Sequence, residues 1–570
     1  MKLLVFVKQV PDVNKIKFDP ETKRIVRKDV PLMMNSFDKK AVEEAIRISE
    51  RHGWETCVAT MGPPQAVEVI NEALRMGIER GYLITDPSLA NSDTLITSRV
   101  LAAFALRYGP DLVLMGKYSL DGETSQVPAE VSALMGWPYV PSVSKIMISD
   151  HLELEQELEN GIYTCSAPLP CVLSLSEKIN RARAIKPDTP QMYDRIVQID
   201  TKWLGLDLDG GRDSPTAVIG TEQVNSNRSP VFIDPGADMY RQIMEIIRVS
   251  RKNDRMKTID LNYAEFRGEA WAIAIDSENA SLEIASKVAD IASENSFYVR
   301  VIGNVEFSDP RSVPAHHVDI ISGTDAVGLS YYIVDEIKKH SPEFLIFPST
   351  VTGRQISSLV AARFGLGLTA DCVDLSYGDR GLLQYKPAFG GGVIAEIISR
   401  KKPAMATARP GMFRKVKVNI EPSISHMSLD PAGRIRYGQF IPVPQEFKPL
   451  EGSRLILGIG RGLKRKEDLP KIMELASMLG ASVGGSRPIV DMNYIPRQQQ
   501  IGLTGSAVSP DVYIALGISG QDNHIVGLRY ARKIIAVNTD RNAPIFRYSD
   551  YGIIMDLMQF VEGFLHFLNA

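Results

Sequence analysis

One loop combines the residue types of a phosphate site with two acids. The stretch GKYSLDGETSQVPAE (116–130) follows the apolar run DLVLM and leads into a helical pattern. Backbone N–H groups at the start of such a helix, together with Ser125 and Gln126, can hold phosphates. Asp121 and Glu123 can point away or cap the helix, and neither role excludes a cofactor. We therefore predict a nucleotide cofactor site formed by Gly116, Asp121, Gly122, Glu123, Thr124, Ser125, Gln126 and Val127.

Two residues at neighbouring predicted strand ends, Lys8 and Asn35, can line the same pocket. The alternative for each is a solvated residue at the edge of the core. The sequence leaves both interpretations open.

A second group of candidate residues follows the predicted strands after residue 450. The carboxyl ends of parallel strands line one crevice, and ligands bind there. The mixture of amides, a cation, a histidine and an acid suits a large redox dinucleotide. Taken singly, Arg487 reads as a surface ion pair, His524 as a satisfied helix-start residue and Asp550 as a helix cap. Together the cluster favours a ligand site that comprises Arg487, Thr504, Ser519, His524, Asn538 and Asp550.

Other kinds of site find little support. The turn GIGRG (458–462) departs from the NAD fingerprint, and no acid follows at the required distance, so we discount NAD binding by a Rossmann domain. The four cysteines form no CxxC pair and the eight histidines no HExxH, so metal catalysis is not expected. A net charge of −3 gives no footprint for nucleic acid or an anionic membrane. The first residues are too soon charged for a signal peptide, and we expect a cytoplasmic protein.

The elements that must position these residues alternate between strands and helices. Short apolar runs and helical patterns follow one another from residue 3 to residue 116, which predicts βαβ units and parallel sheets. Residues 110–143 resemble residues 342–373, and in both the helix ends at glycine, Gly136 and Gly365. This repeat predicts two related domains. Because the second copy lacks the acidic, glycine-containing loop, we expect it to bind no nucleotide.

A third α/β unit begins near residue 450. Residues 207–230 read as loop, and the stretch ADMYRQIMEIIRVSRKNDRMK (237–257) reads as a helix that runs into a basic, polar tail. We place the domains at 1–255, 268–445 and 446–570, with a linker at 256–267 and a candidate hinge at 443–453.

The longest motifs resemble the electron transfer flavoprotein family. Residues 456–568 are similar to the FAD domain of its α subunit in GRGLK, GGSR, DMNYIP, IGLTGSAVSPDVYIALGISG, AVNTD, APIF and SDYG. The region before it resembles the α subunit in GLTADC, KPAFGGGVIAEI and PAMATARPGMF. Residues 1 to about 250 resemble the β subunit in VKQVPD, NSFDKKAVEEA, DTLITS and GKYSLDGETSQV. The resemblance implies an α/β fold of three doubly wound parallel-sheet domains, two of them related adenine-nucleotide-hydrolase-like domains and the last FAD-binding, fused in one monomeric chain.

The resemblance also assigns roles around the C-terminal FAD. Arg487 would lie near the flavin ring and favour reduced, anionic forms, with His524 near the pyrimidine edge. Thr504 would hydrogen-bond near N5, and Leu503 stands where many relatives have glutamine. Ser519 and Gly520 would meet the pyrophosphate, and Asn538 and Asp550 the adenosine half. The full predicted set is Arg461, Ser486, Arg487, Gly502, Thr504, Gly517, Ser519, Gly520, His524, Asn538 and Asp550.

The first loop would hold AMP or a second FAD. DGETSQV shares Gly122, Thr124 and Val127 with the two-flavin pattern of the family, which includes electron-bifurcating members, so we favour two FADs. The implied function is electron transfer from a dehydrogenase, or from NADH, to a membrane quinone oxidoreductase. The rival functions are a FAD-plus-AMP carrier without NADH chemistry and a non-redox adenine-nucleotide-binding regulatory protein.

The partner-recognition loop departs from the family pattern. Residues 180–196 read NRARAIKPDTPQMYDRI, without the lysine run of NEPRYATLPNIMKAKKK. This puts the usual acyl-CoA dehydrogenase partner in doubt. Arg181, Arg183 and Lys186 can still form an exposed docking surface, and a plain solvated loop is the alternative.

Overall fold

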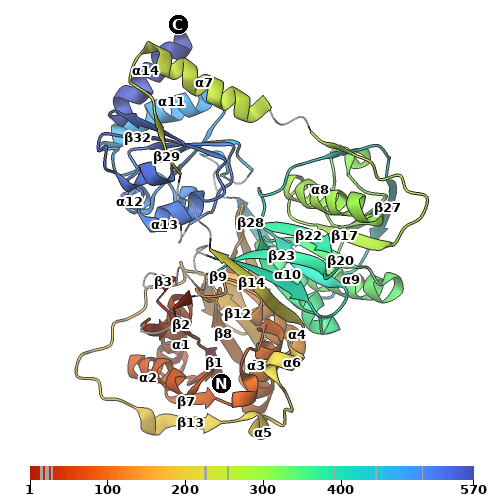
Figure 1. The fold of residues 1–570 in the computed structure, drawn as a ribbon. Helices are drawn as coiled ribbons and strands as arrows, with labels where there is room; N and C mark the ends of the chain where they lie inside the picture. The colour runs from red at the N-terminus through yellow and green to blue at the C-terminus, as the bar shows by residue number, and fades with distance from the viewer. Residues whose placement is uncertain are drawn as a thin grey trace.

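Three large sheets organise the chain, and Figure 1 shows them as three units that follow one another in colour from red to blue. The computed structural model describes residues 1–12, 17–18, 25–26, 30–223, 228–252, 256–388, 393–442, 447–450, 452–502 and 505–570. The α/β class predicted from the alternating pattern is confirmed. In the described part of the chain, no helix has the length and apolar character needed to cross a bilayer.

The first unit is built on a ten-stranded sheet whose centre is parallel. The parallel strands are β1 (Lys2–Phe6), β6 (Glu55–Met61), β7 (Arg80–Ile84), β8 (Leu112–Gly116), β12 (Cys171–Leu175) and β13 (Ile196–Ile199). The helices α1 (Ser36–His52), α2 (Val67–Met76), α3 (Thr94–Tyr108) and α4 (Val127–Met135) connect them. The strands read as apolar runs because both faces are buried, in two core clusters. One edge is antiparallel: β9 (Tyr139–Ile148), β10 (Leu152–Glu157) and β11 (Gly161–Ala167).

The second unit repeats this plan. Its main sheet contains β17 (Gly268–Ala274), β18 (Phe297–Gly303), β19 (His317–Ser322), β20 (Phe344–Pro348), β21 (Leu368–Cys372), β25 (Ala404–Ala408) and β27 (Ser423–Ser428), all parallel. The helices are α8 (Glu278–Asn295), α9 (Ala326–His340) and α10 (Val351–Phe364). The helix of each repeat copy, α4 and α10, ends at a left-handed glycine, Gly136 and Gly365. A small antiparallel sheet adds β22 (Asp374–Gly378), β23 (Gly381–Ala388) and β24 (Val393–Ser399).

The third unit is a six-stranded parallel sheet. Its strands are β29 (Leu455–Ile459), β30 (Ser482–Gly485), β31 (Val512–Leu516), β32 (Lys533–Asn538), β33 (Tyr551–Ile554) and the short β15 (Val231–Phe232). Helices α11 (Leu469–Leu479), α12 (Arg487–Asp491) and α14 (Leu557–Asn569) complete it, with the short α13 (Asp522–Ile525).

Three segments pack outside the unit in which the sequence placed them. β28 (Arg436–Pro442) pairs antiparallel with β11 of the first unit. β14 (Thr216–Gln223) pairs with β24 of the second unit, so the expected loop over these residues was wrong. The missing signal is the partner strand, which comes from the other half of the chain. β15 and α7 (Ala237–Lys252) join the third unit, where Tyr240 packs on Phe560 and Phe564.

The domain boundaries themselves stay predictions. Of the candidate hinge at 443–453, residues 443–446 and 451 lie outside the described part of the chain.

Candidate functional site

Strand order reverses at β1 and β8 in the first sheet, and a cavity of about 980 Å³ opens there. The chain continues from β1 to β6 and β7 on one side, whereas the strands that follow β8 lie on the other side. Such a switch point leaves a crevice outside the carboxyl ends of the strands. The volume is at the upper end of the range for small-molecule sites, about 300–1,000 Å³. The predicted residues that line the cavity are Lys8, Gly116, Gly122, Thr124, Ser125, Gln126 and Val127.

Asn35, Asp121 and Glu123 do not line this cavity, and two of them shape its loop. Asn35 is fully buried; its amide donates to the Tyr118 carbonyl at 2.9 Å and accepts from Leu120 N–H at 3.3 Å. Asp121 lies 2.8 Å from the Lys8 ammonium and accepts the Gly122 N–H, so its charge is neutralised within the loop. Asp121 therefore does not require a cationic ligand in the cavity.

The backbone of the loop presents N–H groups at the start of α4. Glu123 and Ser125 take left-handed conformations, with φ of +50° and +56°. In the described chain the Gln126 side chain makes no capping bond to α4. First-turn N–H groups without a cap, together with the helix dipole, attract anions. The loop therefore has the local geometry expected for a phosphate group.

Gln126 makes hydrogen bonds to both the first and the second unit. Its amide nitrogen donates to the Leu368 carbonyl of the second unit at 3.0 Å, and its oxygen accepts from Thr94 at 2.7 Å. Beneath it, Glu130 accepts from Ser98, and burial raises the pKa of Glu130 to about 8. Because both ends of the amide are engaged, Gln126 joins the loop to the second unit.

The second unit completes the cavity with residues that our sequence analysis did not single out. Lys386 of β23 and Thr369 of β21 line it. Lys386 is 5% exposed, and neither its Nζ nor the Thr369 hydroxyl has a hydrogen-bond partner among the described residues. Burial lowers the pKa of Lys386, while Asp371 and Glu123 oppose that shift. A buried, unpartnered ammonium facing a cavity fits an anionic ligand. The available signal was KPAFGGG, in which Lys386 is the cation.

Asp371 organises the charges behind Lys386. It pairs with Arg409 and with Arg354, the latter at 3.3 Å. Although burial alone would raise its pKa, these cations hold it far below its usual range. Arg354 also reaches Ser125 of the loop, Nη1 to Oγ, at 3.3 Å. One ionic network thus links the second unit to the predicted phosphate loop.

The third sheet has its own switch point, between β29 and β31. Several predicted residues meet there, after the carboxyl ends of the strands: Arg461, Ser486, Gly517, Ser519, Gly520 and Asn538. Gly520 has a φ of +87°, and a Cβ on it would lie 2.2 Å from the Ile545 nitrogen. The Asn538 amide donates to the Ile518 carbonyl at 2.9 Å. This edge is a narrow backbone cradle of the kind that approaches a pyrophosphate.

Arg487 and Gly502 lie at the same edge. The Arg487 side chain is 67% exposed and pairs with Asp491 at 3.3 Å along α12. Gly502 has a φ of +133°. Thr504 and Leu503 lie outside the described residues. The weak surface pair leaves the Arg487 guanidinium available to an incoming ligand.

His524 is buried and neutral. Its Nδ1 lies 2.9 Å from the Ile501 carbonyl, and its Nε2 lies 3.1 Å from the Tyr513 hydroxyl. Burial lowers the pKa of His524 to about 4. The ring therefore donates through Nδ1 and accepts through Nε2. In this conformation the imidazole adds no positive charge. Its hydrogen bonds are those of the alternative interpretation, a histidine whose polar atoms are satisfied within the protein.

Asp550 lies at the opposite edge of the third sheet. It directly precedes β33, whereas Asn538 ends the neighbouring β32. Its carboxylate pairs with Arg228 and, at 3.2 Å, with Lys533 at the amino end of β32. Parallel strands place their amino ends together at one edge of the sheet. Asp550 therefore lies away from the other predicted site residues, which follow the carboxyl ends of the strands.

The three candidate docking residues differ in their contacts and exposure. Arg183 pairs with Glu43 at 2.9 Å and with Glu50 at 2.7 Å, so it anchors its segment to α1. Arg181 and Lys186 are exposed.

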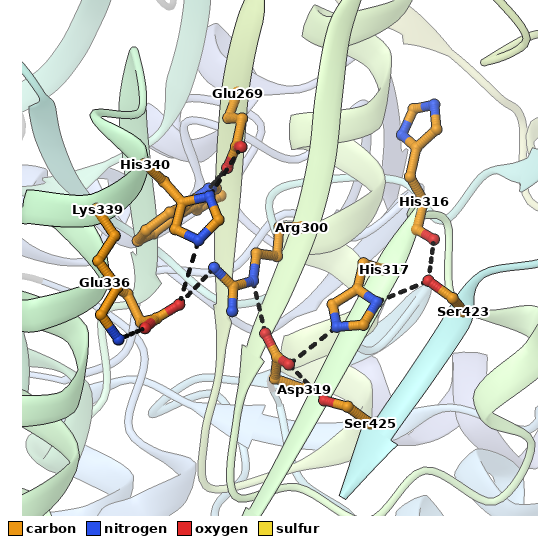
Figure 2. Close-up of polar contacts among 11 residues, drawn as sticks. Glu269, Arg300, His316, His317, Asp319, Glu336, Lys339, His340, Ser423 and Ser425 are labelled. Atoms are coloured by element: carbon orange, nitrogen blue, oxygen red, sulfur yellow. Dashed lines mark hydrogen bonds and ion pairs between the residues drawn. The ribbon is translucent and has the colours of Figure 1, made fainter.

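A further polar network lies in the second unit (Figure 2). The ring nitrogens of His317 lie 2.6 Å from Ser423 and 2.9 Å from Asp319, the residue types of a Ser-His-Asp triad. Asp319 also pairs with buried Arg300 at 2.6 Å, and Arg300 with Glu336 at 2.8 Å. None of these residues lines the cavity. We assign the network to joining β18, β19, β27 and α9.

Comparison with known proteins finds one family that matches segments of all three units. The family described as electron transfer flavoprotein domain matches residues 22–196 and 316–429, and the electron transfer flavoprotein FAD-binding domain matches residues 449–529. The α subunit of Clostridium acetobutylicum electron transfer flavoprotein is 30% identical over 335 residues, 54% of this chain and 99% of the relative. The β subunit from Thermoanaerobacterium thermosaccharolyticum is 35% identical over 237 residues, 40% of this chain and 90% of the relative.

Protein FixB of Clostridium saccharobutylicum is 33% identical over 323 residues, 52% of this chain and 95% of the relative. Relatives of the α and β types thus match within a single polypeptide. The chain belongs to the electron transfer flavoprotein family and joins the sequences of its α and β subunits in one chain.

Proposed function

We propose that this protein carries electrons from a dehydrogenase, or from NADH, to a quinone oxidoreductase, with one FAD at the edge of the third sheet and a second FAD in the cavity of the first unit. The cavity carries the proposal for the second flavin. It combines a volume of about 980 Å³, an uncapped helix start and the unpartnered Lys386 ammonium. DGETSQV adds Gly122, Thr124 and Val127 of the two-flavin pattern.

The residues at the edge of the third sheet have types and backbone conformations that suit a dinucleotide. Gly517 and Gly520 let the backbone approach, with Ser519 between them, and Ser486 begins α12. Arg487 would supply positive charge to a flavin that gains electrons. Bound FAD would supply the redox chemistry, and these side chains would hold and orient it. His524, with both ring nitrogens engaged, would hold the Ile501 segment in place at this site.

The test is cofactor content. The purified protein is denatured, and the released FAD and AMP are quantified by chromatography. Two FADs and no AMP per chain is the expected result. One FAD and one AMP would refute the second flavin and leave a one-flavin carrier.

NADH oxidation is tested separately. Anaerobic mixing with NADH should bleach the flavin absorbance. No bleaching at saturating NADH would remove NADH as a donor and leave dehydrogenases.

A further inference from the structure

A glutamate is buried behind the wall of the first cavity. Glu130 of α4 is 1% exposed and does not itself line the cavity. Its Oε1 lies 3.1 Å from the Thr94 hydroxyl, and its Oε2 accepts from the Ser98 hydroxyl at 2.7 Å. Within the described residues it forms no ion pair with a lysine or an arginine. A buried carboxyl group without a cation favours its neutral form, because ionisation would leave an unpaired charge in the core.

The hydrogen bonds around Thr94 point to the same neutral form. The Gln126 amide nitrogen must face the Leu368 carbonyl, 3.0 Å away, because a carbonyl only accepts. The amide oxygen therefore faces the Thr94 hydroxyl at 2.7 Å and takes its proton. Since a hydroxyl group has one proton to donate, the contact between Thr94 and Glu130 is a hydrogen bond only if Glu130 supplies the proton. A neutral Glu130 thus completes a chain of hydrogen bonds that reaches the second unit.

An ionised Glu130 would break this chain. A carboxylate only accepts, so it would compete with the Gln126 oxygen for the single Thr94 proton. One of these two buried acceptors would then lose its hydrogen bond, which is costly away from water. Thr94 and Gln126 both line the cavity. The proton on Glu130 therefore sets the orientation of two groups that face the cavity, although Glu130 does not line it.

The charged groups on the neighbouring elements act on this region in different ways. Burial raises the pKa of Glu130 to about 8, and the charge of Asp93 at the start of α3 adds to that rise. Arg354 of α10 is held in an ion pair of the second unit. Lys386 of β23 and Asp38 of α1 line the cavity, and burial lowers the pKa of Lys386 and raises that of Asp38 to about 7. A pH experiment therefore has to separate Glu130 from Lys386 and Asp38.

We propose that Glu130 is a positioning residue of the first cofactor site: as a neutral acid it directs the Thr94 hydroxyl to Gln126 and so keeps the loop joined to the second unit around a bound nucleotide. Loss of the proton turns Thr94 away from Gln126 and places a buried negative charge behind a phosphate-bearing ligand, so the nucleotide binds more weakly. The effect on the nucleotide rests on the cofactor proposed above for this cavity, and it is the same for FAD and for AMP. The proton on Glu130 does not depend on that cofactor.

Infrared spectroscopy of the full chain tests for the proton directly. The spectrum of the parent minus that of E130Q at neutral pH should contain the C=O band of a neutral carboxylic acid, which shifts in D₂O and fades as the pH rises past about 8. S98A removes the hydrogen bond to Oε2 and should move this band to higher frequency, which assigns the band while the glutamate stays in place. A parent protein without the band at neutral pH would overturn the proposal.

The matched control for the infrared band is E43Q. Glu43 is a buried glutamate of the same unit, 3% exposed. Although burial alone would raise its pKa, Arg183 lowers it through an ion pair at 2.9 Å. Glu43 is therefore ionised at neutral pH, and E43Q should leave the carboxylic acid band in place.

Nucleotide binding supplies the pH profile. The full chain, with the C-terminal FAD bound, is stripped of nucleotide at the first cavity and titrated with AMP, and with FAD if the chromatography finds two flavins. The quantity compared is the dissociation constant of the parent divided by that of E130Q, because Lys386 and Asp38 titrate in both proteins. Glutamine donates to Thr94 and accepts from Ser98 as a neutral acid does, so this ratio should be near one at neutral pH. Since one proton is lost above a pKa of about 8, the ratio should rise to about 10- to 30-fold at about pH 9.5.

A ratio that is the same at both pH values would overturn the role of Glu130 in binding. If the parent binds neither AMP nor FAD at the first cavity, the cofactor proposed for that cavity falls, and the effect on the nucleotide falls with it. The infrared band still decides in that case whether Glu130 holds its proton, so the two failures are distinguished.

Discussion

Replacing Lys386 by methionine should move stability and cofactor binding in opposite directions. The buried Lys386 ammonium has no hydrogen-bond partner among the described residues. An unsatisfied buried polar group costs about 1–3 kcal/mol, and more when charged. Methionine keeps the length of the side chain and removes that cost. We expect K386M to stabilise the stripped protein by about 1–3 kcal/mol, or about 2–4 °C in melting temperature for each kcal/mol.

The cofactor should respond in the other direction. A hydrogen bond to a charged group contributes about 1.5–3 kcal/mol, so its loss weakens binding by about 10- to 150-fold. K386M protein should therefore retain the C-terminal FAD and lose most of the second cofactor on gel filtration. Released cofactor is quantified by chromatography.

The pH dependence gives an independent check. The pKa of Lys386 in the folded protein is lowered, chiefly by burial. The unfolded chain then binds more protons between that pKa and the ordinary value, so stability rises with pH across this window. K386M should lose this slope. The control is K338M, which removes an exposed lysine on α9.

The result that would refute the reasoning is a stripped K386M protein that melts lower than the parent while purified K386M retains both cofactors at full occupancy.

Three further predictions follow from the same structure. D371N leaves the partly buried Arg409 without its carboxylate partner and should lower the free energy of unfolding by about 3–5 kcal/mol in urea titrations; a change below 1 kcal/mol would contradict the network. The pKa of His524 is lowered to about 4, so as the pH falls the unfolded chain binds a proton before the folded chain does. The free energy of unfolding should therefore fall by about 3 kcal/mol from pH 6.5 to pH 4. Thermal melts of the third unit at several pH values measure this slope, and H524Q should flatten it. G520A forces a Cβ against backbone and should empty the C-terminal FAD site in absorbance spectra, whereas G480A, with open space, should keep its flavin.

Local patterns were sufficient for many of the parallel strands and their connecting helices, and for the loop of the first cavity. Apolar runs bounded by glycine predict buried strands, and the glycines at the ends of α4 and α10 are left-handed as expected. Gly122 and the residues Thr124 to Val127 line the cavity because a strand–loop–helix unit places them at the carboxyl end of β8.

Features that depend on distant partners could not be predicted. The residues of β14 read as loop because β24, which supplies its hydrogen bonds, follows almost two hundred residues later. Lys386 faces a cavity that belongs mostly to the other half of the chain. Asp550 precedes its strand, and only the direction of β33 reveals that it lies at the edge opposite Asn538.

The pairing of β28 with β11 has a consequence for synthesis. The strand that pairs with the edge of β11 is synthesised about 270 residues later. At about 5–20 residues per second, the delay between the two strands is roughly 13–54 s. An open strand edge is a template for pairing with other chains. During that interval the nascent first unit exposes such an edge, so its need for a chaperone should be greatest before residue 442 has emerged.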